Sequence, residues 1–263
     1  MRSRIKLLIV IALGLPLLVG CAANMPKTVE GFDVIAGKMD KVTVMPPHFT
    51  LGEVGAFSEQ TVSDMNHDIE LEVKRSADAL MAESRYAPAP LEAGDSALAA
   101  DSELRRMLGE STQEIGRIAE GVRNTKGKVI DVPYTGNLDY FSDITNADYL
   151  LFLSGSGWFK TGGAKAKEAA TGIVLAAIFG AAPTSSPGSA TTLEAFLVDA
   201  NLGKVIWYNA VSYADRDPRK PRDLLSTSQA LMAPLLGKST IKGDKSRDNE
   251  LINKYEARLD EKK

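Results

Sequence analysis

The sequence begins with an apolar run, Leu7 to Leu18, that follows three basic residues and no acidic one. A helix needs about 20 apolar residues to cross the hydrocarbon of a bilayer, so these 12 residues are too few. A basic start, a short apolar centre and small residues after it are typical of an export signal. We therefore expect residues 1–20 to be removed and the fold to be built by the residues that follow.

The four residues Leu18-Val19-Gly20-Cys21 come at the end of this run. They resemble the lipobox of bacterial lipoproteins, a family in which the signal is cut between the positions of Gly20 and Cys21. The resemblance implies that Cys21 carries a diacylglyceryl thioether and an acylated amine, with chains such as palmitate. Because two or more chains anchor a protein stably, it implies a lipid anchor in the membrane of the cell envelope. Ala22-Ala23-Asn24 contain no aspartate, and by analogy with that family this implies the outer membrane, with the domain facing the periplasm.

Composition excludes several classes of protein. Cys21 is the single cysteine, so an intrachain disulfide and a thiolate metal site are excluded, and His48 and His67 are the only histidines. The formal net charge is −3, and loss of the three basic residues of the signal makes it −6, which argues against nucleic-acid binding. We expect no metal, no cofactor and no catalytic residue, and we interpret the protein as not an enzyme.

Hydrophobic patterns predict one α/β domain over residues 41–237. Its architecture is three-layer-like: helices pack on a mixed sheet, and the sheet ends in a β-hairpin. We expect a tether over 21–40 and a charged tail over 238–263. Helices are predicted over 57–84, 96–123 and 224–235. Strands are predicted over 41–45, 128–132, 149–153, 192–199 and 204–213, the first ended by Pro46-Pro47 and the last two joined by an Asn/Gly turn.

The connection over 160–191 contains an apolar stretch at 171–182 that is too short to cross a membrane as a helix. Three interpretations stay open: a helix of the protein's own core, an exposed segment for a partner or a membrane surface, and a membrane-inserting hairpin. Trp158-Phe159 stands just before it, among glycines at the end of a strand. Trp158, Phe159, Ile173 and Phe179 are therefore the candidate partner contacts.

Three phrases carry a wider resemblance: Lys41-Val42-Thr43-Val44-Met45-Pro46-Pro47, Ala147-Asp148-Tyr149-Leu150-Leu151-Phe152, and the hairpin from Leu197 to Trp207. They resemble a group of envelope lipoproteins that includes the curli-secretion channel lipoprotein, the lipoprotein activators of penicillin-binding proteins, and small neisserial-type lipoproteins. The resemblance implies an α/β domain of anticodon-binding-like or TolB N-terminal-like topology that acts through protein contacts, usually without enzyme activity.

We therefore expect a non-enzymatic accessory or assembly factor whose partners are the membrane, through the lipid on Cys21, and other envelope proteins. The first alternative is a homo-oligomeric outer-membrane secretion channel, in which residues 160–191 insert into the bilayer. The second is a periplasmic hydrolase with an unrecognised site.

Overall fold

The computed structural model describes residues 26–54, 59–88, 91, 101–160 and 188–237. Gly20 and Cys21, Ile173 and Phe179, and the tail at 238–263 lie outside these residues. In chain order the described elements are β1 (Lys27–Thr28), α2 (Phe32–Lys38), β2 (Lys41–Val44), β3 (His48–Val54), α3 (Glu59–Ala82), β4 (Ala87–Pro88), α5 (Ser102–Asn124), β5 (Val132–Pro133), α6 (Leu138–Thr145), β6 (Tyr149–Lys160), β7 (Ser189–Asp199), β8 (Lys204–Ala214) and α8 (Pro221–Met232).

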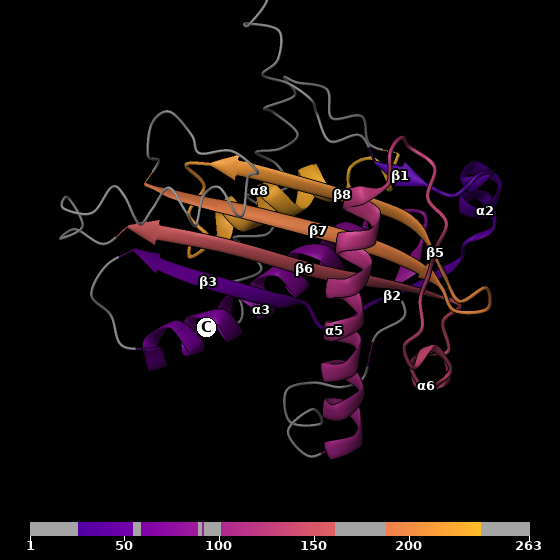
Figure 1. The fold of residues 1–263 in the computed structure, drawn as a ribbon, viewed down its shortest axis with the longest axis horizontal. Helices are drawn as coiled ribbons and strands as arrows, with labels where there is room; N and C mark the ends of the chain where they lie inside the picture. Colours follow the sequence, from indigo (N-terminus) through magenta and orange to yellow (C-terminus); the bar gives the residue numbers. More distant parts are fainter. Residues whose placement is uncertain (1–25, 55–58, 89–90, 92–100, 161–187, 238–263) are drawn as a thin grey trace, which may run out of the picture.

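A mixed sheet of eight strands runs through the molecule in the order β1-β8-β7-β6-β2-β4, with β3 also paired to β6 and β5 to β8 (Figure 1). The long strands β6, β7 and β8 are antiparallel, whereas β2 and β3 run parallel to β6. The apolar start of β6 is buried on both faces, as expected for a strand between two helical layers. The predicted mixed α/β fold and its terminal hairpin are thus confirmed.

The two prolines after β2 interrupt a strand rather than end it. Val44 pairs with Leu151 and His48 pairs with Ser154, so four steps along β2–β3 match three along β6. The extra residue is accommodated as in a β-bulge, where the missing N–H of a proline costs no ladder hydrogen bond. His48, which directly follows the two prolines, is therefore not a loop residue but the first residue of β3.

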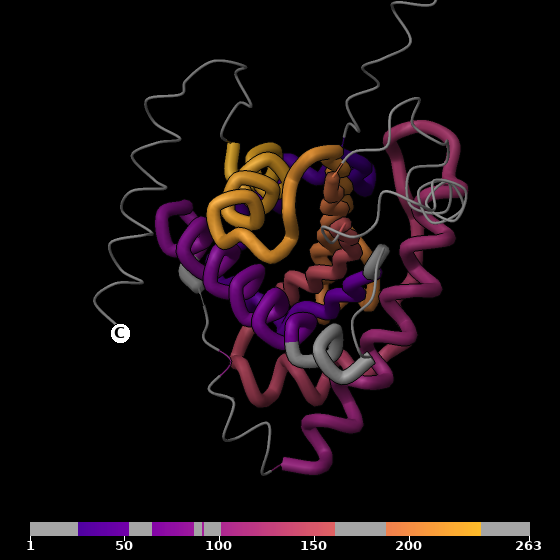
Figure 2. The backbone as a smooth tube through the Cα atoms, turned by 90° about the vertical axis from the view of Figure 1, so that its left-hand side faces the viewer, coloured from indigo at the N-terminus to yellow at the C-terminus, as the bar shows by residue number. Residues whose placement is uncertain are grey.

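Helices cover both faces of the sheet, as the end-on view shows (Figure 2). α3 and α8 pack on one face, where Val73, Ala77 and Leu231 join the buried residues of the strands. α5 and α6 pack on the other face through Ile118 and Phe141. The inward residues of α5 are spaced by three or four, which is the period of one helix face.

Both ends of α5 have hydrogen-bond partners. The Asp101 carboxylate accepts hydrogen bonds from the amides of Glu103 and Leu104 at the start of the helix. At its other end the Lys27 ammonium donates to the carbonyls of Val122 and Thr125, at 2.5 and 2.8 Å. A cation at this end also complements the helix dipole.

The expected tether is shorter than predicted. Lys27 and Thr28 form β1 against β8, and α2 follows within the range 21–40. The pattern also misses α6, and the predicted strand over 128–132 shrinks to a bridge at Val129 and the two-residue β5. Short elements of this kind are held by their neighbours rather than by a periodic pattern of their own.

Candidate functional site

Four hydroxyl side chains stand in one line across the sheet. Thr50 of β3 lies opposite Ser156 of β6, Ser156 opposite Thr192 of β7, and Thr192 opposite Ser212 of β8. Successive side chains alternate between faces, so all four lie on the face that carries α5 and α6. We call this line the hydroxyl row.

The hydroxyl row lies beyond the part of the sheet that α5 covers. Figure 1 shows α5 in front of the strands nearer to β5, while no described helix crosses in front of the arrowheads of β6 and β8. Thr50 and Ser212 are exposed, and Ser156 and Thr192 are half-buried. The hydroxyls of Thr192 and Ser212 are 2.9 Å apart, within hydrogen-bond distance. The row therefore carries uncharged donors and acceptors, and its two outer members are exposed.

The glycines beside Ser156 explain the sequence Ser154-Gly155-Ser156-Gly157. Both glycines face α3 and α8, where a Cβ on Gly155 would meet the ring of Phe49 at 2.7 Å. A Cβ on Gly157 would meet the Pro218 ring at 2.8 Å and the Ala190 carbonyl oxygen at 2.9 Å. Only glycine admits such close approach. The alternation thus places packing on one face and hydroxyls on the other.

An ion pair between an exposed arginine and a buried carboxylate borders the hydroxyl row on the side of α5. Arg123 donates two hydrogen bonds to the Glu194 carboxylate, at 2.9 and 2.7 Å, and the Tyr208 hydroxyl donates a third at 3.1 Å. Burial and the neighbouring Glu194 carboxylate raise the pKa of Tyr208, so its hydroxyl stays a donor. The hydrogen bonds to Glu194 raise the pKa of Arg123. The pair ties the C-terminal turn of α5 to the centre of the sheet.

The aromatic pair at the other border is not exposed. The side chains of Trp158 and Phe159 keep 0% and 1% of their surface accessible, so the structure corrects the expectation that they contact a partner. Phe159 packs under the Arg219 guanidinium, 3.7 Å from the ring centroid, and Asp217 holds that guanidinium by two hydrogen bonds. The indole N–H of Trp158 has no hydrogen-bond partner among the described residues.

The β3 edge of the sheet is capped by side chains from α3. The amide of Phe49 donates to the Glu70 carboxylate and the amide of Leu51 to the Asn66 carbonyl, both at 2.9 Å. Occupied edge amides cannot pair with another strand, and native sheets use such devices to prevent unwanted association. This edge is therefore closed to strand addition at those two positions.

The β8 edge is not capped in the same way. No described strand pairs with β8 after Tyr208, where its contact with β1 ends. The Asp215 amide donates to the Ser189 carbonyl, so odd-numbered residues of β8 turn their backbone groups toward β7. Alternation along the ladder then turns those of Ala210, Ser212 and Ala214 outward. Ala210 is buried, whereas Ser212 and Ala214 are exposed, so an added strand can reach this edge at its last two outward positions.

His48 lies at the opposite end of the site from β8. Its Nδ1 is 3.5 Å from the Glu70 carboxylate, and hydrogen bonding to Glu70 raises the pKa of His48. His48 lies opposite Ser154 in the ladder, but no hydrogen bond within the described part of the chain joins the two side chains. His67 is exposed on α3, and the described residues contain no cluster of three metal-ligating side chains.

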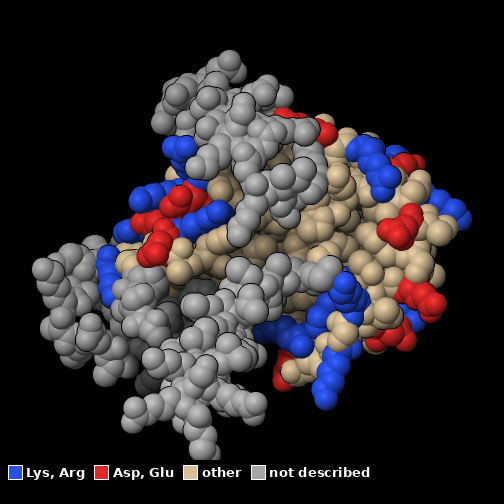
Figure 3. Space-filling view, turned by 90° about the horizontal axis from the view of Figure 1, so that it is seen from above, with Lys and Arg blue, Asp and Glu red and all other residues tan. Residues whose placement is uncertain are grey.

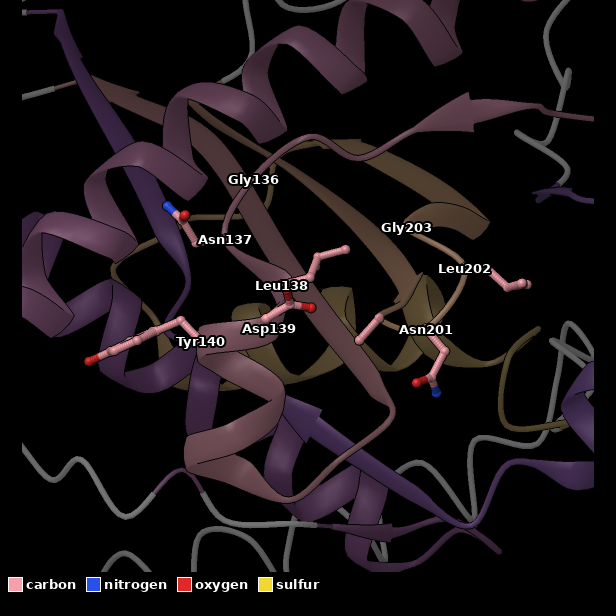
Figure 4. A pocket seen from close by; sticks show the side chains of 9 residues that line it. Gly136, Asn137, Leu138, Asp139, Tyr140, Asn201, Leu202 and Gly203 are labelled. Carbon is pink, nitrogen blue, oxygen red and sulfur yellow. The ribbon is translucent and has the colours of Figure 1, made fainter.

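A separate pocket of about 360 Å³ lies at the other end of the sheet, between the start of α6 and the β7–β8 turn (Figure 4). Its wall includes the loop before α6, which α5 holds in place. The Glu114 carboxylate accepts hydrogen bonds from the Thr135 amide and hydroxyl, at 2.7 and 2.8 Å, and from Arg117. The pocket is lined by Gly136, Asn137, Leu138, Asp139, Tyr140, Ala200, Asn201, Leu202 and Gly203.

Comparisons with known proteins find no matching family model and no matching curated protein. Among solved structures, the chain is similar to a PelC dodecamer from Paraburkholderia phytofirmans, with 15% identity and a TM-score of 0.30 over 75% of this chain and 90% of that one. It is similar to lipoprotein GNA1162 from Neisseria meningitidis, with 14% identity and a TM-score of 0.32 over 76% and 99%. The third is the LpoB C-terminal domain from Salmonella enterica, with 11% identity and a TM-score of 0.23 over 66% and 82%. At these values the function must be argued from this chain's own residues.

The described helices include none that is both long and apolar enough to span a bilayer. Sequence patterns did not predict the hydroxyl row, because its members come from four strands separated by up to 162 positions. The signal that was available locally is the alternation Ser-Gly-Ser-Gly in β6, which marks a strand with one face too crowded for side chains.

Proposed function

We propose that this protein is a lipoprotein of the cell envelope, anchored in the outer membrane through Cys21, that acts by binding another envelope protein rather than by catalysis. The observation that carries the binding role is the outward-facing backbone of Ala210, Ser212 and Ala214 beside the hydroxyl row. An added strand would gain main-chain hydrogen bonds there, and its side chain opposite Ser212 would extend the hydroxyl row by one position.

The character of the row supports an uncharged, polar segment as the strand that binds. The four members offer hydroxyls, and the buried Glu194 carboxylate, two positions along β7 from Thr192, is already paired with Arg123. A charged strand would be desolvated at this surface without a partner of opposite sign, whereas Ser, Thr, Asn or Gln side chains would find hydrogen bonds.

Substitution of Cys21 tests the anchor. Cys21→Ala removes the acylated sulfur, so we expect an uncleaved precursor or a protein that leaves the membrane fraction. Fractionation with a high-salt wash and mass analysis of the N-terminus read this out, and Ala23→Ser serves as the matched control. A processed Cys21→Ala protein that stays in the salt-washed membranes would refute lipid anchoring.

Substitution of Ser212 tests strand addition. Because the Ser212 amide faces outward, Ser212→Pro removes a donor from the free edge and leaves the β7–β8 ladder intact. A photo-crosslinking residue at Ala214 should give a discrete adduct with one envelope protein in cells. We expect Ser212→Pro to abolish that adduct and Ser212→Ala to keep it. An adduct with a second copy of this chain would instead favour the oligomeric alternative, and an adduct that survives Ser212→Pro would refute binding through this edge.

A further inference from the structure

The chain between the proposed lipid and the fold is very short. Only five residues separate Cys21 from Lys27, where β1 begins and pairs with Tyr208. The Val29 amide also donates to the Ile206 carbonyl, so the chain is fixed to the sheet from this point onward. A fully extended chain spans at most about 3.6 Å per residue, so β1 lies within about 20 Å of the lipidated residue. This step depends on the anchor proposed above.

The large apolar side chains that the described residues expose all lie at the end of the sheet where β1 is found. Val129 bridges to Thr28 of β1. The other three belong to α2, to the turn between β7 and β8, and to the last turn of α6, which precedes β6. Figure 1 shows these elements together at one end of the sheet, opposite the arrowheads of β6 and β8. The four residues and their exposed fractions are Val34 (64%), Val129 (60%), Leu202 (59%) and Ile144 (43%).

The charges at this end suit contact with a membrane surface rather than insertion. Lys126 and Lys128 are exposed beside Val129, while Asp139 and Asp143 are exposed on α6. Figure 3 shows acidic and basic side chains interspersed at this end, with no large patch of one sign. Basic residues beside an apolar side chain favour the headgroup region, and acidic ones are repelled by anionic lipid. Near the start of α2, Glu30 and Asp33 are exposed beside Val34. The contact should therefore centre on Val129 with its two lysines, with β1 and α2 beside it, and reach α6 least.

We infer that the end of the domain formed by β1, α2, the residue Val129 and the β7–β8 turn rests on the lipid surface, held there by the short segment after Cys21. The occupant of this apolar end is the headgroup region of the bilayer. The arrangement turns the hydroxyl row and the free edge of β8 away from the membrane, toward partners in the periplasm.

Single-site fluorescent labelling tests this orientation. A cysteine that carries a thioether has no free thiol, so Val129→Cys, Leu202→Cys and Ser212→Cys each create a unique labelling site on the full lipoprotein. The protein is reconstituted in vesicles of phosphatidylethanolamine and phosphatidylglycerol that contain a headgroup-quencher lipid. We expect a blue shift and strong quenching at positions 129 and 202, with neither at position 212.

The control with no added cysteine separates the two proposals. If the thiol reagent labels the unsubstituted protein, Cys21 is not modified, and the anchor itself is refuted. If only the engineered sites are labelled but all three are quenched equally, the domain has no fixed orientation and the inference fails. Strong quenching at position 212 alone would also overturn the inference. A blue shift at position 129 without lipid quenching would overturn it too, because it would show that another protein chain covers this end.

Discussion

Replacing Arg123 by methionine removes the cation that balances a buried carboxylate. Glu194 is 7% exposed and accepts two hydrogen bonds from Arg123 and one from Tyr208. Loss of one partner of a buried pair costs about 3–5 kcal/mol. The Arg123 side chain is 58% exposed, so water can reach the carboxylate once the guanidinium is gone. Tyr208 also still donates its hydrogen bond to Glu194, and both effects reduce the cost. We expect the free energy of unfolding to fall by about 2 kcal/mol.

Chemical unfolding followed by circular dichroism measures this change, with Arg106→Met as the matched control on the same helix. Arg106 pairs with Glu103 and Glu110, and all three side chains are about half exposed. Exposed pairs contribute little, so the control should leave the free energy of unfolding almost unchanged. Equal losses in the two variants would refute the reasoning that burial of the carboxylate sets the cost.

A second substitution sharpens the test by changing sign. In the native background Glu194→Gln turns an amide toward the guanidinium and should destabilise the fold by about 1 kcal/mol. In the Arg123→Met background the same change removes an unbalanced buried charge while Tyr208 keeps an acceptor, so it should stabilise the fold. If Glu194→Gln destabilises both backgrounds alike, Arg123 and Glu194 are not coupled, and the interpretation of the pair is wrong.

Two further predictions concern stability elsewhere. Hydrogen bonds from Arg117 and the following loop hold the pKa of Glu114 at about 2, so its stabilisation is full above pH 4.5 and is lost as the pH falls toward 2. Glu114→Gln should reduce the pH dependence of the unfolding free energy over this range, whereas Glu120→Gln on the same helix should leave it unchanged. If the pH dependence of the Glu114→Gln variant equals that of the unsubstituted protein, the prediction is wrong. Gly157→Ala forces a methyl group against a proline ring and a carbonyl oxygen and should cost about 1–3 kcal/mol in chemical unfolding. A methyl group on Gly116 of α5 would meet open space, so Gly116→Ala should raise the free energy of unfolding by up to about 1 kcal/mol. A similar loss of stability in the Gly157→Ala and Gly116→Ala variants would contradict the steric explanation.

The long periodic elements could be predicted because each carries its own pattern. The inward residues of α5 recur every three or four positions, and the apolar start of β6 indicates a strand between two layers. The hairpin of β7 and β8 is marked by its Asn/Gly turn. These elements suffice for the α/β class, because a sheet with apolar residues on both faces must be covered by helices on both.

The short elements and the continuation of β2 into β3 could not be predicted in this way. β1 and α2 are too short for a pattern and are held by β8 and by the end of α5. Pro46-Pro47 reads as the end of a strand, but β6 provides the ladder on which the strand resumes. Trp158 stands among glycines, as an exposed aromatic residue would, yet those glycines admit close packing on the opposite face.

By itself, the sequence determined the class of fold and excluded an intrachain disulfide, because these depend on period and on local residue types. Only the tertiary structure decided which side chains share a surface. Register across β3, β6, β7 and β8 brings the hydroxyl row together, side chains from α3 close the β3 edge of the sheet, and no described strand pairs with the last residues of β8. Register and edges are properties of contacts between distant segments, and no local pattern contains them.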